Sequence, residues 1–79
     1  MWFVYILLCS DSTFYTGITN NLDKRIKTHN SGKGAKYTRC RLPVKLVYYE
    51  EIEDKSSALK REIAIKSLKR KEKEALIKE

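Results

Sequence analysis

The feature that most constrains this chain is the run of residues 2–9, which is almost continuously apolar and rich in β-branched and aromatic side chains. Such a run predicts a strand that is covered on both faces and is therefore central in its sheet. The next residues, Ser10-Asp11-Ser12, are typical of a turn. Residues 13–19 then predict a second strand, so the chain is expected to open with a β-hairpin.

The length of the hairpin loop decides whether Tyr5 and Tyr15 lie on the same face of the sheet. A three-residue loop pairs Tyr5 with Gly17 and Leu7 with Tyr15, which places Tyr5 and Tyr15 on the same face. A four-residue loop places them on opposite faces, and the residue pattern leaves both registers open. Gly17 either allows a close approach to the backbone or forms a bulge at the end of the hairpin.

A helix is predicted from about residue 21 to residue 30, with an asparagine cap at its start and a glycine-containing stop after it. Leu22 and Ile26 mark its inward face, and His29 falls beside them, with Arg25 one turn earlier. Burying an arginine without a partner is costly, so this edge is expected to open on a cleft. The alternative for His29 is an ordinary hydrogen-bonded core histidine.

The second half of the chain predicts a third strand over residues 45–52 and a helix from residues 54–57 to about residue 68. Residues 71–78 predict a final amphipathic turn or two. One side of the long helix carries the apolar residues Ala58, Leu59, Ile63, Ile65 and Leu68. Glu62 lies within that side, where a carboxylate needs a cation. Either a bound metal or Lys66, one turn later, could supply that cation.

These elements indicate one α+β domain over residues 1–79, with a small, three-stranded, mainly antiparallel sheet flanked by helices. No stretch approaches the roughly 20 apolar residues of a membrane span. Two cysteines are too few for a disulfide framework, which favours a cytoplasmic location.

The distribution of charge favours a polyanionic ligand. The net charge is +7, and residues 1–49 hold 8 basic and 2 acidic side chains, whereas residues 50–79 hold 9 and 8. Residues 24–49 contain no acid, and tyrosines and glycines stand among their lysines and arginines. This pattern is typical of nucleic-acid binding, although a merely solvated basic face would look the same.

Several short motifs occur in a fixed order along the chain: Val4-Tyr5-Ile6, Tyr15-Thr16-Gly17, Arg25, His29, Lys36-Tyr37-Thr38 and Glu62. The ordered set resembles the GIY-YIG nuclease domain, above all its small single-domain bacterial members, and the resemblance extends from residue 3 to about residue 77. The naming motifs depart from the pattern: Phe3 stands in place of the first glycine and Thr16 in place of an isoleucine. The tyrosines and Gly17 match.

The resemblance implies hydrolysis of DNA phosphodiester bonds with Mg²⁺ or Mn²⁺. It implies that Glu62 holds the metal and that Tyr5 is the general base. Tyr15 and Tyr37 would position water or phosphate, Arg25 would stabilise charge on the phosphate, and His29 would bond to Tyr5 or assist proton movement. We expect contacts with DNA from the glycine of the second motif and the basic loop: Gly17, Lys33, Lys36, Arg39 and Arg41. A protein partner could supply specificity.

Two alternatives remain at this point. A nucleic-acid-binding module could keep the fold and the basic face without catalysis. A structural zinc site could use Cys9, Cys40 and His29, but the chain has no paired ligand spacing such as Cys-x-x-Cys, which disfavours it.

Overall fold

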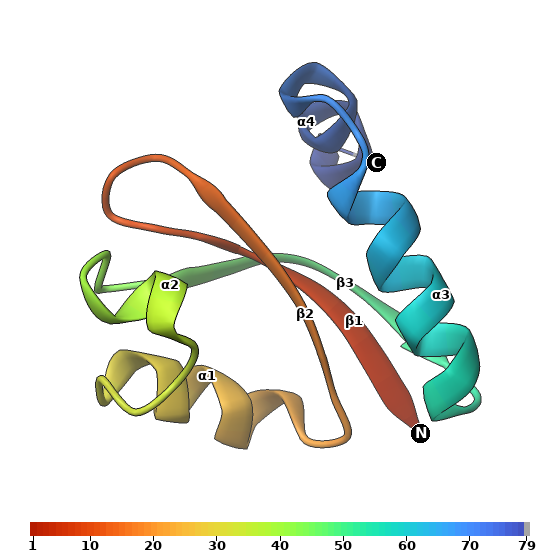
Figure 1. Cartoon of the computed structure of the whole chain (residues 1–79), viewed down its shortest axis with the longest axis horizontal. Helices are drawn as coiled ribbons and strands as arrows, with labels where there is room; N and C mark the ends of the chain where they lie inside the picture. The colour runs from red at the N-terminus through yellow and green to blue at the C-terminus, as the bar shows by residue number, and fades with distance from the viewer. Residues whose placement is uncertain (79) are drawn as a thin grey trace.

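The computed structural model describes residues 1–78 and consists of a three-stranded sheet with four helices (Figure 1). In chain order the elements are β1 (Trp2–Leu8), β2 (Phe14–Thr19), α1 (Leu22–Asn30), α2 (Lys36–Arg39), β3 (Lys45–Ile52), α3 (Lys55–Lys66) and α4 (Arg70–Lys78). The strand order is β2-β1-β3, and both pairings are antiparallel. The predicted α+β architecture and the central position of the first strand are therefore confirmed. None of the helices within residues 1–78 has the length and apolarity that a membrane crossing requires.

The hairpin adopts the register of the three-residue loop. Tyr5 pairs with Gly17 and Leu7 pairs with Tyr15, and the Cys9 N–H donates to the Thr13 carbonyl at 2.8 Å. Ser12 has a φ of 68°, the left-handed conformation that closes loops of this length. Tyr5 and Tyr15 consequently lie on the same face of the sheet.

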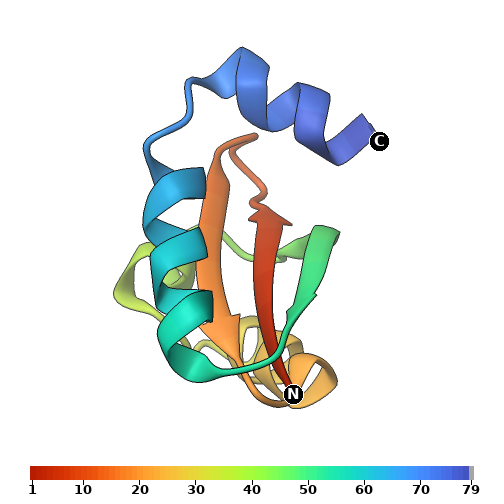
Figure 2. The same ribbon diagram turned by 90° about the vertical axis from the view of Figure 1, so that its right-hand side faces the viewer.

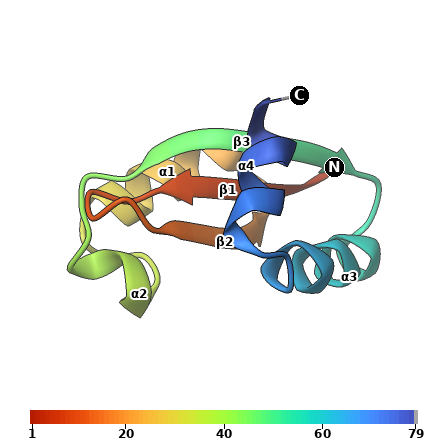
Figure 3. The same cartoon turned by 90° about the horizontal axis from the view of Figure 1, so that it is seen from above.

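The two faces of β1 form two separate cores, because successive side chains alternate across the strand. On one face, Tyr5 and Leu7 pack with Leu22 and Ile26 of α1. On the other face, the second core is formed by Val4, Ile6, Ala58 and Ile65, with Leu76 and Ile77 against it. The sheet is thus the middle layer, with α1 and α2 on one side and α3 and α4 on the other (Figures 2 and 3).

Two predictions about the helices were wrong. Residues 36–39 were expected to be loop but form the short helix α2. Leu59 and Ile63 were expected to be buried, yet they are 41% and 67% exposed. Helix α3 packs along a narrow stripe through Ala58 and Ile65, and residues one and five positions after Ala58 turn away from such a stripe. Glu62 therefore lies at the margin of the buried stripe.

Candidate active site

A buried tyrosine at the middle of the central strand is the centre of the candidate site. Tyr5 is 1% exposed, and its hydroxyl lies 3.0 Å from Nε2 of His29. The Arg25 Nε–H donates to the same hydroxyl oxygen at 3.4 Å. Both partners come from α1, whose Asn21 side chain caps the helix by accepting from the Lys24 N–H. The sheet and α1 thus bring together three of the predicted residues.

The partners of His29 determine which of its nitrogens carries the proton. Its Nδ1 lies 2.9 Å from the Thr38 hydroxyl oxygen, and that hydroxyl donates its own proton to the Ala35 carbonyl at 2.9 Å. The hydroxyl oxygen is therefore left to accept, and Nδ1–H must be the donor. Neutral His29 consequently presents Nε2 as an acceptor for the Tyr5 hydroxyl.

The burial of this pair keeps both groups neutral at neutral pH. Burial raises the pKa of Tyr5, an effect that the Arg25 hydrogen bond opposes and that the Glu62 carboxylate weakly reinforces. Burial also lowers the pKa of His29, and the nearby positive charge of Arg25 acts in the same direction. A phenol hydrogen-bonded to a neutral imidazole is thus the resting state, and any phenolate must form by moving the proton to His29.

The lowered pKa of His29 predicts a specific loss of stability in mild acid. The unfolded chain takes up a proton near pH 6.5, whereas the folded chain does so only at a lower pH. Between these two values the unfolded state binds more protons, so stability falls as pH decreases below about 6.5, by at most about 1.4 kcal/mol per pH unit. Urea unfolding at closely spaced pH values from 7.5 to 5 measures this slope.

His29→Gln is the control for that prediction, because His29 is the chain's one histidine. The glutamine variant should be less stable overall and should show no slope between pH 7 and 5.5. An unchanged slope in the variant would assign the effect to other groups.

Two glycines leave the space that is filled by the tyrosine cluster, which consists of Tyr5, His29, Tyr15 and Tyr37. A Cβ at Gly17 would lie 2.6 Å from the Tyr5 hydroxyl oxygen and 2.8 Å from its Cζ. A Cβ at Gly34 would lie 2.8 Å from the His29 Cα and would also meet its ring. Gly17 is therefore required for close approach of the Tyr5 ring, and the alternative of a bulge at Gly17 is excluded by the regular register of β1 and β2.

Replacing Gly17 by alanine is expected to disable the site by displacing the Tyr5 ring. The hydroxyl of Tyr5 is held between Arg25 and His29, so it cannot yield without breaking those contacts. We expect a loss of about 1–3 kcal/mol of stability. A shift of the hydroxyl by about 1 Å should reduce any activity that depends on it by about a hundredfold.

A double-mutant cycle tests the cause of that loss. Removing the Tyr5 hydroxyl relieves the shortest of the contacts, so Gly17→Ala should cost less stability in a Tyr5→Phe background than in the wild type. Additive losses, measured by chemical unfolding, would contradict the steric explanation.

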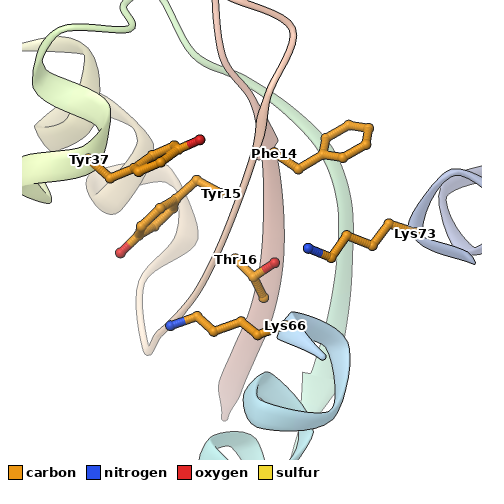
Figure 4. A pocket seen from close by; sticks show the side chains of 6 residues that line it. All are labelled: Phe14, Tyr15, Thr16, Tyr37, Lys66 and Lys73. Carbon is orange, nitrogen blue, oxygen red and sulfur yellow. The ribbon is translucent and has the colours of Figure 1, made fainter. Parts of the chain in front are cut away.

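Tyr15 and Tyr37 form the outer wall of the cluster. Tyr15 packs edge-on against the His29 ring, with centroids 5.3 Å apart, and stacks on Tyr37 at 6.0 Å (Figure 4). Tyr37 is carried by α2, and the Arg41 guanidinium lies 4.1 Å from its ring centroid. The site thus extends from the buried Tyr5 to a surface-exposed tyrosine.

Glu62 approaches from the opposite face of the sheet. Its side chain is 16% exposed, and its carboxylate lies 3.7 Å from the Lys66 ammonium group. Within residues 1–78 it forms no hydrogen bond to the tyrosine cluster, and its link to Tyr5 is electrostatic. Because α3 and Tyr5 lie on different faces, the two can act on one ligand only around the free edge of β2, where Gly17 presents no side chain.

The basic residues of the α1–β3 connection differ in how they are engaged. Lys33, Lys36 and Arg39 are exposed, and none of the ion pairs within residues 1–78 involves them. Arg41 instead pairs with Asp11 at 2.9 Å and donates to the Tyr37 carbonyl at 2.8 Å. Arg41 therefore braces Tyr37 in this state, and three cations remain free for a ligand.

Sequence reasoning missed two residues of the site. Thr38 is fully buried and sets the tautomer of His29, although it was noted only as part of a motif. Gly34 was interpreted as a helix stop and loop residue, whereas its missing side chain makes room for His29. No local pattern distinguishes these roles, because each depends on how residues 34–38 fold back over α1.

The zinc alternative receives no support from the described part of the chain. No group of three or more His, Cys, Asp and Glu side chains within residues 1–78 could hold a metal ion. Both ring nitrogens of His29 are already hydrogen-bonded, and Cys9 is buried while Cys40 is exposed.

Comparison with known proteins gives a consistent result. A family model described as the GIY-YIG catalytic domain matches residues 1–75. The chain is 61% identical over 77 residues to UPF0213 protein CPE1444 of Clostridium perfringens, a match that covers 98% of this chain and 83% of that protein. It is 52% identical over 75 residues to UPF0213 protein NP_0776A of Natronomonas pharaonis, a match that covers 95% of this chain and 88% of that protein.

Two solved structures resemble the fold. The solution structure of UPF0213 protein BH0048 from Bacillus halodurans has a TM-score of 0.63 at 48% identity, covering 99% of this chain and 84% of that chain. The solution structure of EF2693 from E. faecalis has a TM-score of 0.64 at 46% identity, covering 96% and 81%. The fold described above is thus similar to that of these two proteins.

Proposed function

The chain belongs to the GIY-YIG family, and on that premise we propose that it is a divalent-metal-dependent endonuclease that hydrolyses phosphodiester bonds in DNA. The observation that carries the proposal is the hydrogen-bonded series from the Tyr5 hydroxyl through His29 to Thr38. It gives a buried tyrosine a route for losing its proton, next to an arginine.

The donor set at the edge of β2 fits a hard divalent cation with few protein ligands. The Glu62 carboxylate acts electrostatically on Tyr5, and its present partner is a lysine 3.7 Å away. A single carboxylate suits Mg²⁺ or Mn²⁺, which retain water and bind substrate phosphate at their other positions. When bound, the metal would supply charge neutralisation at the phosphoryl oxygens. Glu62 is the residue that would hold it.

Different side chains of the protein then transfer the proton and stabilise the negative charge. The Tyr5 oxygen takes a proton from the attacking water while its own proton passes to Nε2 of His29. The Nδ1–H of His29 stays bonded to Thr38, which holds the ring in place as the imidazolium forms. Arg25 donates to the Tyr5 oxygen at 3.4 Å, so it stabilises negative charge on that oxygen and on a phosphate beside it.

The outer residues are assigned to substrate positioning. Tyr15 and Tyr37 lie at the mouth of the site, where hydroxyls can bond to water or phosphate. Gly17 contributes indirectly, because its missing side chain leaves the space that the Tyr5 ring occupies. Lys33, Lys36 and Arg39 provide positive charge around Tyr37 for contacts with DNA phosphates. Arg41 would join them only by releasing its contact with Asp11. Specificity for a sequence or DNA structure would then come from this basic surface or from a protein partner.

The decisive experiment is cleavage of labelled duplex, branched and single-stranded DNA with Mg²⁺ or Mn²⁺, comparing wild type with Glu62→Gln. Metal-dependent cleavage that the variant lacks would support the proposal. Cleavage that survives in the variant would point to a contaminant or to a different metal ligand.

The second candidate function is a DNA-binding module without catalysis, favoured by the free cations around Tyr37. Salt-sensitive DNA binding by both proteins, with no cleavage in any metal, would support this function or an enzyme that needs a partner.

A further inference from the structure

A groove crosses the free edge of β2 beside the tyrosine cluster and continues toward the C-terminal helices. Its volume is about 270 Å³, and it is lined by Phe14, Tyr15, Thr16, Tyr37, Lys66 and Lys73. Figure 4 shows the Lys73 side chain of α4 directed at Thr16, whereas the Lys66 side chain of α3 passes below Thr16 in this view and ends on the side of Tyr15. The groove begins at Tyr15 and Tyr37, so it is a continuation of the candidate active site on the α3 and α4 side of the sheet.

The lining of this groove contains hydrogen-bond donors and no carboxylate. Lys73 takes part in none of the ion pairs within residues 1–78, and Lys66 pairs only with Glu62 at the groove margin. No hydrogen bond within that range engages the Thr16 hydroxyl, and no buried side-chain oxygen there is left without a partner. The Thr16 hydroxyl must therefore reach the space of the groove.

The backbone of β2 adds a further donor. Cys9 and Thr13 share a backbone hydrogen bond, and hydrogen-bonded pairs alternate along antiparallel strands. By the observed register Tyr15 and Gly17 direct their N–H groups to β1, whereas the Thr16 N–H points outward from the sheet edge. Two ammonium groups, a hydroxyl and an outward amide thus line one groove, a combination suited to an oxyanion.

We propose that this groove is a second phosphate subsite, in which Lys66, Lys73 and Thr16 bind a backbone phosphate of the DNA strand next to the phosphate that is cut. This inference rests on the proposed nuclease function and extends it. The DNA strand would run from the basic residues around Tyr37, across the edge of β2, to α4. The C-terminal helices, whose half of the chain is nearly neutral overall, then contribute directly to binding.

The test is a comparison of Lys73→Met with Lys71→Met in EDTA, where cleavage is not supported. Both changes remove one positive charge from α4, but residues two apart on a helix point in nearly opposite directions. Affinity for a labelled DNA fragment is measured between 50 and 200 mM salt. For Lys73→Met we expect weaker binding and a salt slope smaller by about one, so that the fall in affinity over this range shrinks by about fourfold. Lys71→Met should keep the wild-type slope.

The outcomes separate this inference from the proposed function. Equal slopes for the two variants, with wild type still binding and cutting DNA, would overturn the subsite alone. Wild type that neither binds nor cuts DNA would overturn both. Inorganic phosphate is the second probe, and the amide resonance of Thr16 is the readout. If inorganic phosphate shifts this resonance but saturating DNA does not, the groove binds a free phosphate ion and the proposed contact with the DNA strand is overturned.

Discussion

Replacing Glu62 by glutamine is expected to reduce Mg²⁺-dependent DNA cleavage by about a thousandfold or more while the fold stays intact. Glutamine keeps the size of the side chain and an oxygen but removes the charge that holds a divalent cation. Loss of the metal's charge neutralisation at the phosphate is worth several kcal/mol, and about 4 kcal/mol corresponds to three orders of magnitude in rate. The measurement is single-turnover cleavage, with Mn²⁺ binding followed by electron paramagnetic resonance as a direct readout of the metal.

The control for Glu62 is Glu74→Gln, because both carboxylates form i,i+4 pairs of similar length. Glu62 lies 3.7 Å from Lys66, and Glu74 lies 3.8 Å from Arg70 on α4. Such pairs contribute about 0.5 kcal/mol or less to stability, so both variants should unfold close to wild type. Only Glu62→Gln should lose cleavage and bound Mn²⁺. Equal cleavage by the two variants would remove Glu62 from the role of metal ligand.

The central part of the fold could be predicted because its pattern is local. The apolar run of residues 2–9 implies a strand covered on both faces whatever surrounds it, and β1 is the middle strand. The stripe of Leu22 and Ile26 likewise places His29 and Arg25 toward the sheet, since helical geometry allows no other arrangement. The sequence left two hairpin registers open, and only the observed register, with Tyr5 opposite Gly17, places Tyr15 on the same face as Tyr5.

The remaining features depend on contacts between distant segments. Whether Leu59 and Ile63 are buried depends on how much of α3 the sheet covers, and periodicity alone does not give that width. The role of Thr38 depends on the fold of residues 34–38 over α1. Lys66 reaches the groove from the end of α3, and Lys73 reaches it because the chain turns after α3 into α4 (Figure 1). Residues 50–79 are nearly neutral overall, so the distribution of charge along the sequence does not single out these two lysines.

Replacing Tyr5 by phenylalanine is expected to reduce cleavage by about 10²–10⁴-fold, the usual contribution of a general base. The ring stays in the core, so the packing of β1 against α1 is retained. The lost hydroxyl leaves Nε2 of His29 as a buried acceptor without a donor, which should cost about 1–3 kcal/mol of stability. Cleavage rates are compared at a temperature where chemical unfolding shows both proteins to be folded.

Two further variants identify Tyr5 and His29 as one catalytic unit. Tyr49→Phe removes the same hydroxyl from an exposed tyrosine directly opposite Tyr5 on β3 and should leave cleavage unchanged. If the Tyr5 proton passes to His29, Tyr5→Phe combined with His29→Gln should cut no more slowly than the slower of the two single variants. Multiplicative losses would instead mean that the two residues act independently, and a Tyr5→Phe rate within tenfold of wild type would assign the general base to another group.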